Sequence, residues 1–313
     1  SSLALLGPRT NFRVIKSAKA WAAPVRLQMP ISPPKSQRYK SKTPAAFSVA
    51  SRVAPGPTSA VVDRLFRSTR RSAPRPGERD ILDGATPSEV AGMRVWSWGE
   101  GPTVLLVHGW NGRATQLGDF VEPLVARGYR VVAFDAIGHG ESRGKFSSLP
   151  ELATCIELVA DALGEVYGVI AHSLGGAATT FALSRGLRVE RAVFISPPSD
   201  PREFLSMVSG ALGASDEVRL LVKERVERRL GTALEDMRAE MLARSMTTPL
   251  LVIHDENDKE VPVGVGRRIA RAWPGAELVI TQGLGHQRIL RAEPVLNRAV
   301  SFIDAPRRWK VAA

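Results

Sequence analysis

From residue 90 onward, short apolar segments alternate with longer segments in which apolar residues recur at helical spacing. The apolar segments lack strict alternation, which is typical of strands covered on both faces. They span residues 93–98, 103–109, 130–135, 167–173, 191–196, 249–255 and 276–283, and helical spacing is clearest over 115–128, 150–166 and 175–186. Alternating strands and helices predict an α/β fold with a mostly parallel central sheet flanked by helices. We expect residues 93–98 to form its antiparallel edge.

One interval, residues 199–247, interrupts this rhythm with helical character and no strand signal. Its clearest helices are expected at 217–230 and 233–246. An insertion after the carboxyl end of a strand lies over the ligand crevice of an open α/β sheet, so we interpret it as a helical lid. Its apolar residues are candidates either for lining a substrate site or for packing: Phe204, Leu205, Met207, Val208, Leu212 and Leu221.

The amino-terminal region has a different composition from the rest of the chain. Residues 1–62 contain 10 lysine or arginine residues and no acidic residue, so most of the net charge of +12 lies there. For residues 1–58, three interpretations stay open: a disordered leader, an organellar targeting peptide, or a segment that binds nucleic acid or an anionic membrane. Residues 59–71 predict a short amphipathic helix, which either docks on the main domain or contacts a membrane interface.

These observations give a scheme of domains. It comprises a leader (1–58), a short helix with a linker (59–89), the first part of the core (90–198), the lid (199–247), the second part of the core (248–305) and a tail (306–313). Cytoplasm is the default location, and the basic leader leaves organellar targeting open.

Composition and missing motifs exclude several classes of protein. The single cysteine, Cys155, excludes an intrachain disulfide framework and a multi-cysteine metal site. No segment has the roughly 20 mostly apolar residues of a membrane span. Phosphate loops, dinucleotide fingerprints and metal-ligand clusters are missing, so we expect no cofactor and no nucleic-acid partner.

The strongest chemical signal is the segment 167–183, where an apolar strand leads into His172-Ser173-Leu174-Gly175 and then into a helix. Small residues at Ala171 and Gly175 permit a tight turn that holds the Ser173 hydroxyl at the start of the helix, where negative charge is favoured. The pattern A-x-S-x-G resembles the nucleophile elbow of the α/β-hydrolase superfamily, in its lid-bearing serine esterase or lipase form.

The resemblance extends over residues 90–305 and implies roles for further residues. The backbone amides of Trp110 and Leu174 would form an oxyanion hole, with His108 bracing the loop before Trp110. The segment 250–262 would supply Asp258 as the acid of a catalytic triad, with Asp255 and Asp200 as alternatives, and His286 would be its base. Asp135, His139 and Ser142, in the segment 134–142 at the end of the third expected strand, would be structural.

We therefore expect a serine hydrolase that cleaves small-molecule carboxylic esters through an acyl-enzyme. A thioesterase, an amidase, a carbon–carbon hydrolase and a cofactor-free peroxidase use the same triad and stay open as alternatives, as does a non-catalytic binding protein of the same fold.

Overall fold

The computed structural model describes residues 13–15 and 45–305, which fall into two compact units. The core unit holds residues 13–15, 68–200 and 236–305. The helical unit holds residues 45–67 and 201–235.

The core unit contains a nine-stranded sheet in the order β1-β9-β8-β7-β6-β4-β5-β3-β2. The strands are β1 (Arg13–Ile15), β2 (Thr86–Val90), β3 (Met93–Trp98), β4 (Thr103–Val107), β5 (Arg130–Phe134), β6 (Val166–His172), β7 (Arg191–Ile195), β8 (Leu250–Asp255) and β9 (Glu277–Thr281). Strands β4 to β9 run parallel, whereas β1, β2 and β3 pair antiparallel with their neighbours. The predicted fold class is confirmed.

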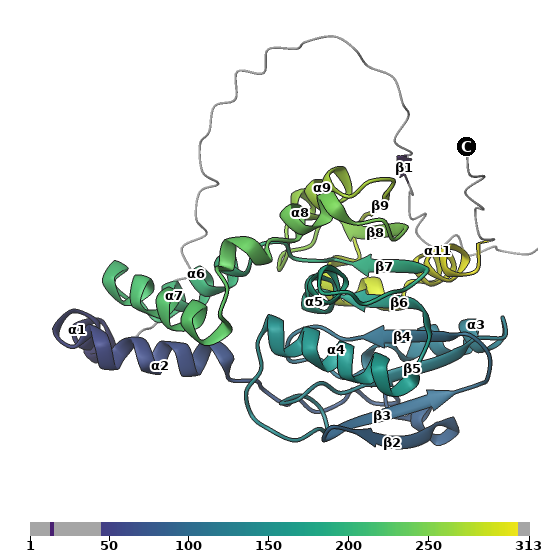
Figure 1. The fold of residues 1–313 in the computed structure, drawn as a ribbon, viewed down its shortest axis with the longest axis horizontal. Coiled ribbons are helices and arrows are strands. Elements are labelled where there is room, and N and C mark those ends of the chain that lie inside the picture. The colour runs from purple at the N-terminus through teal and green to yellow at the C-terminus, as the bar shows by residue number, and fades with distance from the viewer. Residues whose placement is uncertain (1–12, 16–44, 306–313) are drawn as a thin grey trace, which may run out of the picture. The chain divides into compact units, whose positions relative to one another are not determined.

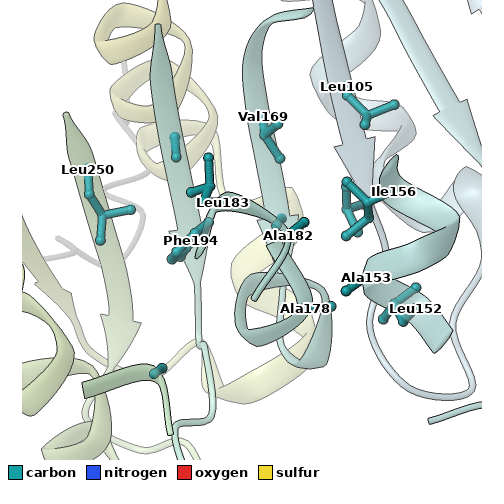
Figure 2. Close-up of a cluster of buried hydrophobic side chains, with 14 of the residues drawn as sticks. Leu105, Leu152, Ala153, Ile156, Val169, Ala178, Ala182, Leu183, Phe194 and Leu250 are labelled. Atoms are coloured by element: carbon teal, nitrogen blue, oxygen red, sulfur yellow. The ribbon is translucent and has the colours of Figure 1, made fainter. Parts of the chain in front are cut away.

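Helices cover both faces of this sheet, which explains why its parallel strands are largely apolar. On β4, Leu105 and Val107 contribute to the hydrophobic cluster on one face, while Val104 and Leu106 contribute to the cluster on the other. The first face is covered by α4 (Leu149–Leu163), α5 (Leu174–Ser184), α8 (Ala239–Leu242) and α9 (Val263–Ala272), and the second by η2 (Ala114–Phe120), α3 (Val121–Val125), η5 (Ile289–Arg291) and α11 (Glu293–Ile303). Figure 1 shows α4 and α5 lying over the strands, and Figure 2 shows side chains of these two helices against strand residues such as Val169.

The predicted edge strand is wrong in one respect, because β3 is antiparallel but is followed outward by β2. The two strands are joined by Ala91 and Gly92, which both have positive φ angles, 50° and 82°. Positive φ at both central residues is typical of a tight two-residue hairpin turn. The side chains of β2 are mostly exposed, so this strand has no apolar pattern from which to predict it.

The helical unit consists of α1 (Ala45–Val53), α2 (Pro55–Arg67), α6 (Pro201–Ala211) and α7 (Asp216–Leu230), as Figure 1 shows. Helix α2 packs mainly against α7 and also contacts α1 and α6. At the start of α7, the amide of Ser215 donates to Ser51 Oγ at 2.6 Å and its hydroxyl donates to the Ser51 carbonyl at 3.0 Å. Arg229 of α7 contacts both carboxylate oxygens of Asp63 of α2, at 2.7 and 2.8 Å. The amino-terminal helices are therefore an integral part of this unit.

This arrangement corrects several boundaries of the predicted domains. Residues 45–53 and 55–58, assigned to a disordered leader, are helical. The short helix predicted over 59–71 is present as part of α2, but the linker that follows it contains a 3-10 helix (η1, Asp80–Gly84) and β2. Residues 1–12, 16–44 and 306–313 lie outside the described residues. The insertion is shorter than predicted, because residues 236–247 belong to the core unit. The helix expected over 233–246 is broken into η3 (Leu234–Met237), α8 and η4 (Ala243–Ser245).

The two ends of the insertion meet within the core unit. The amide of Ala239 donates to the Ser199 carbonyl at 2.9 Å, and Arg238 Nε lies 3.6 Å from the Asp200 carboxylate. The residues that leave the sheet after β7 and those that return toward β8 are thus held together on the core side.

Adjacent residues of α2 test whether this helix is part of a packed unit. Val62 is fully buried and Val61 is 50% exposed. We expect Val62→Asp to destabilise the helical unit by about 3 kcal/mol or more, since it buries a carboxylate without a partner. Val61→Asp, the matched control, is expected to change stability by less than about 1 kcal/mol. Limited proteolysis with mass identification of cleavage within α2 and α7 measures the difference, and equal protection of both variants would contradict the packing.

Candidate active site

Ser173 lies at a strained turn between β6 and α5. Its φ and ψ are 50° and −126°, a conformation that side-chain-bearing residues adopt at an energetic cost. The turn is closed by Gly175, where a Cβ atom would come within 2.6 Å of the His108 carbonyl oxygen and 2.7 Å of the Val107 carbonyl oxygen. No larger residue fits at this position, so the sharp turn depends on glycine. The turn places Ser173 at the start of α5, where the helix dipole favours negative charge.

The side chains of Ser173, Asp258 and His286 form one hydrogen-bonded series. Along the chain, 85 positions separate Ser173 from Asp258, and 28 separate Asp258 from His286. His286 Nε2 lies 3.0 Å from Ser173 Oγ, and His286 Nδ1 lies 2.7 Å from Asp258 Oδ2. With Nδ1 donating to the carboxylate, Nε2 is free to accept the serine proton. The imidazole is only 7% exposed, so little water competes with these contacts.

The Asp258 carboxylate is held in its charged form. Its Oδ1 accepts hydrogen bonds from the amides of Glu260 and Val261, both at 2.9 Å. His254 Nε2, which donates to the Val261 carbonyl at 2.8 Å, lies 3.5 Å from Asp258 Oδ2. Burial opposes the charge, but the bonds from His254, His286 and the Val261 amide hold the pKa of Asp258 well below its usual range. A fixed anion is what orients an imidazole and stabilises its protonated form.

Asp255, an alternative for the acid, has a different task. Its fully buried carboxylate accepts hydrogen bonds from the amides of Gly285 and Leu284 at 2.9 and 3.0 Å and from the Thr281 hydroxyl at 2.7 Å. It also accepts from the amide of Asn257 at 2.9 Å. Burial raises the pKa of Asp255, but these donors outweigh it and lower the pKa overall. The carboxylate therefore ties the loop that carries Asp258 to the loop that carries His286.

The sequence analysis considered Asp255 only as an alternative acid and did not predict that it ties these two loops together. The signal that was available is the polarity itself: an Asp at the buried end of an apolar strand needs several donors close by.

Two other histidines brace the site. His172 Nε2 lies 2.9 Å from the His286 carbonyl oxygen and donates to it, which fixes the histidine loop. Burial, together with the charge of His286, lowers the pKa of His172 to about 3, so this ring is neutral. His108 accepts from the Ala136 amide at Nε2 (3.0 Å) and donates from Nδ1 to the Gly109 carbonyl (2.7 Å). Both ring nitrogens of His108 are thus occupied by the backbone.

The two backbone amides expected to bind an oxyanion belong to segments beside Ser173. Leu174 directly follows Ser173 at the first position of α5. On the other segment, a Cβ atom on Gly109 would come within 2.9 Å of Ser173 Cβ, so the chain just before Trp110 passes against Ser173. The Trp110 ring packs edge-on against His139, with 5.5 Å between ring centroids.

Asp135, Ser142 and Asp200 lie outside the series Asp258–His286–Ser173 and have other partners. Asp135 accepts from the amides of Ala114 and Glu141, both at 2.7 Å, and Gly140 is required beside it, since a Cβ atom there would overlap its carboxylate. Ser142 accepts from the Arg94 amide at 2.8 Å. Asp200, the second alternative for the acid, lies close to Arg238.

The six residues proposed to line a substrate site all lie in the helical unit: Phe204, Leu205, Met207, Val208, Leu212 and Leu221. Leu205 is buried and Met207 is 50% exposed, while the Phe204 ring lies 5.3 Å from the ring of Phe66 on α2. Their role at an acyl site stays a prediction. Within residues 13–15 and 45–305, no group of three or more His, Cys, Asp or Glu side chains is placed to hold a metal ion.

Comparison with known proteins agrees with this architecture. A pimeloyl-[acyl-carrier protein] methyl ester esterase of Nitrosomonas europaea is 26% identical over 246 residues, covering 64% of this chain and 95% of that protein. A 2-hydroxy-6-oxononadienedioate/2-hydroxy-6-oxononatrienedioate hydrolase of Cupriavidus pinatubonensis is 28% identical over 63% of this chain and 85% of its own. A putative lipase of Acinetobacter baumannii superposes with a TM-score of 0.56 at 18% identity, over 78% of this chain and 95% of that one. The model of the alpha/beta hydrolase family matches residues 104–298, and the chain therefore belongs to that family.

Proposed function

We propose that this protein is a serine hydrolase that cleaves carboxylic esters through an acyl-enzyme intermediate. The observation that carries the proposal is the series Asp258–His286–Ser173, with distances of 2.7 and 3.0 Å, ending on a serine at a strained turn. A serine hydroxyl is a weak nucleophile until an adjacent base removes its proton. The geometry supplies that base and an anion to support it.

The proposed chemistry proceeds in two halves. His286 Nε2 takes the proton of Ser173 as Oγ attacks the acyl carbon, and the amides of Trp110 and Leu174 hold the resulting oxyanion. His286 then gives the proton to the departing alcohol oxygen, which leaves the acyl group on Ser173. A water molecule, deprotonated by the same imidazole, attacks the acyl-enzyme, releases the carboxylic acid and returns the proton to Ser173.

Two further observations support ester hydrolysis by this chain. Its curated relatives include a methyl ester esterase, hydrolases and a non-heme chloroperoxidase, which supports an enzyme rather than a binding protein. The insertion also leaves the sheet after β7, at the carboxyl end of the strands, where Ser173 follows β6 and Asp258 follows β8. Ligands bind at this end of an α/β sheet, so we propose that the insertion acts as a lid and that its apolar residues favour hydrophobic acyl groups.

A panel of p-nitrophenyl esters with acyl chains of increasing length tests the proposal. We expect hydrolysis of the butyrate and hexanoate esters with rates above that of the acetate, since a longer apolar chain buries more surface in an apolar site. Labelling with a fluorophosphonate followed by peptide mass spectrometry is expected to place the adduct on Ser173. The panel also includes a thioester and an anilide with the same acyl group. Faster turnover of either one would replace the ester assignment, and a missing adduct would favour a binding protein.

A further inference from the structure

The outward face of the amino-terminal helix pair is apolar. Val49 and Val53 of α1 are 59% and 78% exposed, and Val61 and Leu65 of α2 are 50% and 46% exposed. Each pair is four residues apart and therefore shares one face of its helix. We call these four residues the apolar face. Of the eight large hydrophobic residues exposed in the described part of the chain, six lie in the helical unit, and four of these six form the apolar face.

The charged residues of α1 and α2 are three arginines and one aspartate. Arg52 and Arg64 lie on exposed positions of α1 and α2. Asp63, the first acidic residue of the whole chain, is turned inward, where it is only 9% exposed and pairs with Arg229 at 2.7 Å and with Arg67 at 3.5 Å. The exposed side chains described on α1 and α2 are thus apolar or arginine, and none of them is acidic.

We propose that the apolar face of α1 and α2 docks on the surface of an anionic lipid bilayer. Helices that combine exposed aliphatic side chains with arginine lie in the interface between headgroups and acyl chains, where the arginine stems extend toward the phosphates. Anionic lipids add an attraction for each basic residue near the surface. The contact is peripheral, since none of the described helices has the length and apolar character needed to cross a bilayer.

Nucleic acid is the other partner that positive charge attracts, and the composition of the face disfavours it. Phosphate backbones are bound by basic and polar side chains, and single strands also need aromatic side chains on which bases stack. The apolar face has only aliphatic side chains, which gain nothing from a phosphate backbone but are removed from water at a membrane interface.

Sedimentation of the full chain with lipid vesicles tests the proposal. We expect the protein to co-sediment with vesicles of phosphatidylglycerol and phosphatidylcholine and to stay in solution with phosphatidylcholine alone. The double variant Val61→Asp/Leu65→Asp is expected to bind about ten-fold or more weakly. The double variant Arg52→Gln/Arg64→Gln is expected to lose roughly five-fold for each arginine removed. Leu158→Asp is the matched control and should bind like the wild type, since Leu158 lies at an exposed position of α4 in the core unit (43% exposed).

Three outcomes would overturn the proposal. The first is equal binding to both kinds of vesicle, and the second is binding that Val61→Asp/Leu65→Asp leaves unchanged, because basic residues outside the face would then suffice. The third is a change in oligomeric state, measured by light scattering, in place of a change in vesicle binding, which would assign the face to a second copy of the chain. Ester hydrolysis of soluble substrates serves as a folding control, and its loss in these variants would indicate misfolding.

Discussion

Ser173→Ala is expected to lower kcat for hydrolysis of p-nitrophenyl butyrate by about 10⁴- to 10⁶-fold. The change removes the atom that we propose attacks the acyl carbon, while His286 and Asp258 remain bonded to each other at 2.7 Å. Some residual rate should persist, because amides that bind the oxyanion act independently of the nucleophile. Measurements at saturating substrate separate this loss of turnover from a loss of binding.

A matched control is available on the same helix. Ser184, at the end of α5, is exposed, and its hydroxyl only donates to the Phe181 carbonyl at 2.7 Å. Ser184→Ala should keep full activity, and both variants should have the circular dichroism spectrum of the wild type. If Ser173→Ala keeps its activity and its spectrum, Ser173 is not the nucleophile and the proposed reaction fails.

The elbow was predictable because its geometry depends on residue size within a few consecutive positions. Gly175 has to be glycine, since two carbonyl oxygens lie where its Cβ atom would stand. An apolar strand directly before Ser173 and a small-residue helix directly after it are likewise visible as local patterns. The parallel strands of the core were predictable for the same reason, because burial on both faces makes each one largely apolar.

Features that depend on contacts between distant segments were not visible in this way. Helix α1 packs against α2, and its Ser51 is bonded to Ser215 of α7, which is more than 160 residues away in sequence. The residues of α1 alone do not predict this packing. Strand β2 was missed for a different reason. It pairs with the adjacent β3 through backbone bonds and exposes its side chains, so it has no apolar pattern.

Substitutions of Asp255, the last residue of β8, and of Asp258, which follows this strand, separate the proposed chemistry from positioning. We expect Asp258→Asn to lower kcat by about 10⁴-fold, since a neutral amide neither holds the Nδ1–H tautomer of His286 nor stabilises the charge that develops on the ring. Asp255→Asn keeps the shape but puts an amide nitrogen among backbone donors. We expect kcat to fall by only about 10- to 100-fold, through displacement of the histidine loop.

The dependence of stability on pH tests the part that Asp255 has in tying the two loops together. The pKa of Asp255 is lowered in the folded protein, so its contribution to the free energy of unfolding is present above the pKa of an unfolded aspartate, about 3.9, and is lost as the pH falls below it. The gap in stability between the wild type and Asp255→Asn, measured by urea unfolding, should therefore be about 2 to 4 kcal/mol at pH 7 and shrink below about pH 4.

Equal losses of kcat in the two aspartate variants would contradict this division, because a carboxylate that only ties two loops together should act through the position of His286. Recovery of activity under stabilising conditions distinguishes the two variants. Lower temperature or a stabilising osmolyte should restore part of the activity of Asp255→Asn, since the loop returns to its place when the native state is favoured. Neither treatment should restore Asp258→Asn, because no packing of the loop replaces the missing charge beside Nδ1.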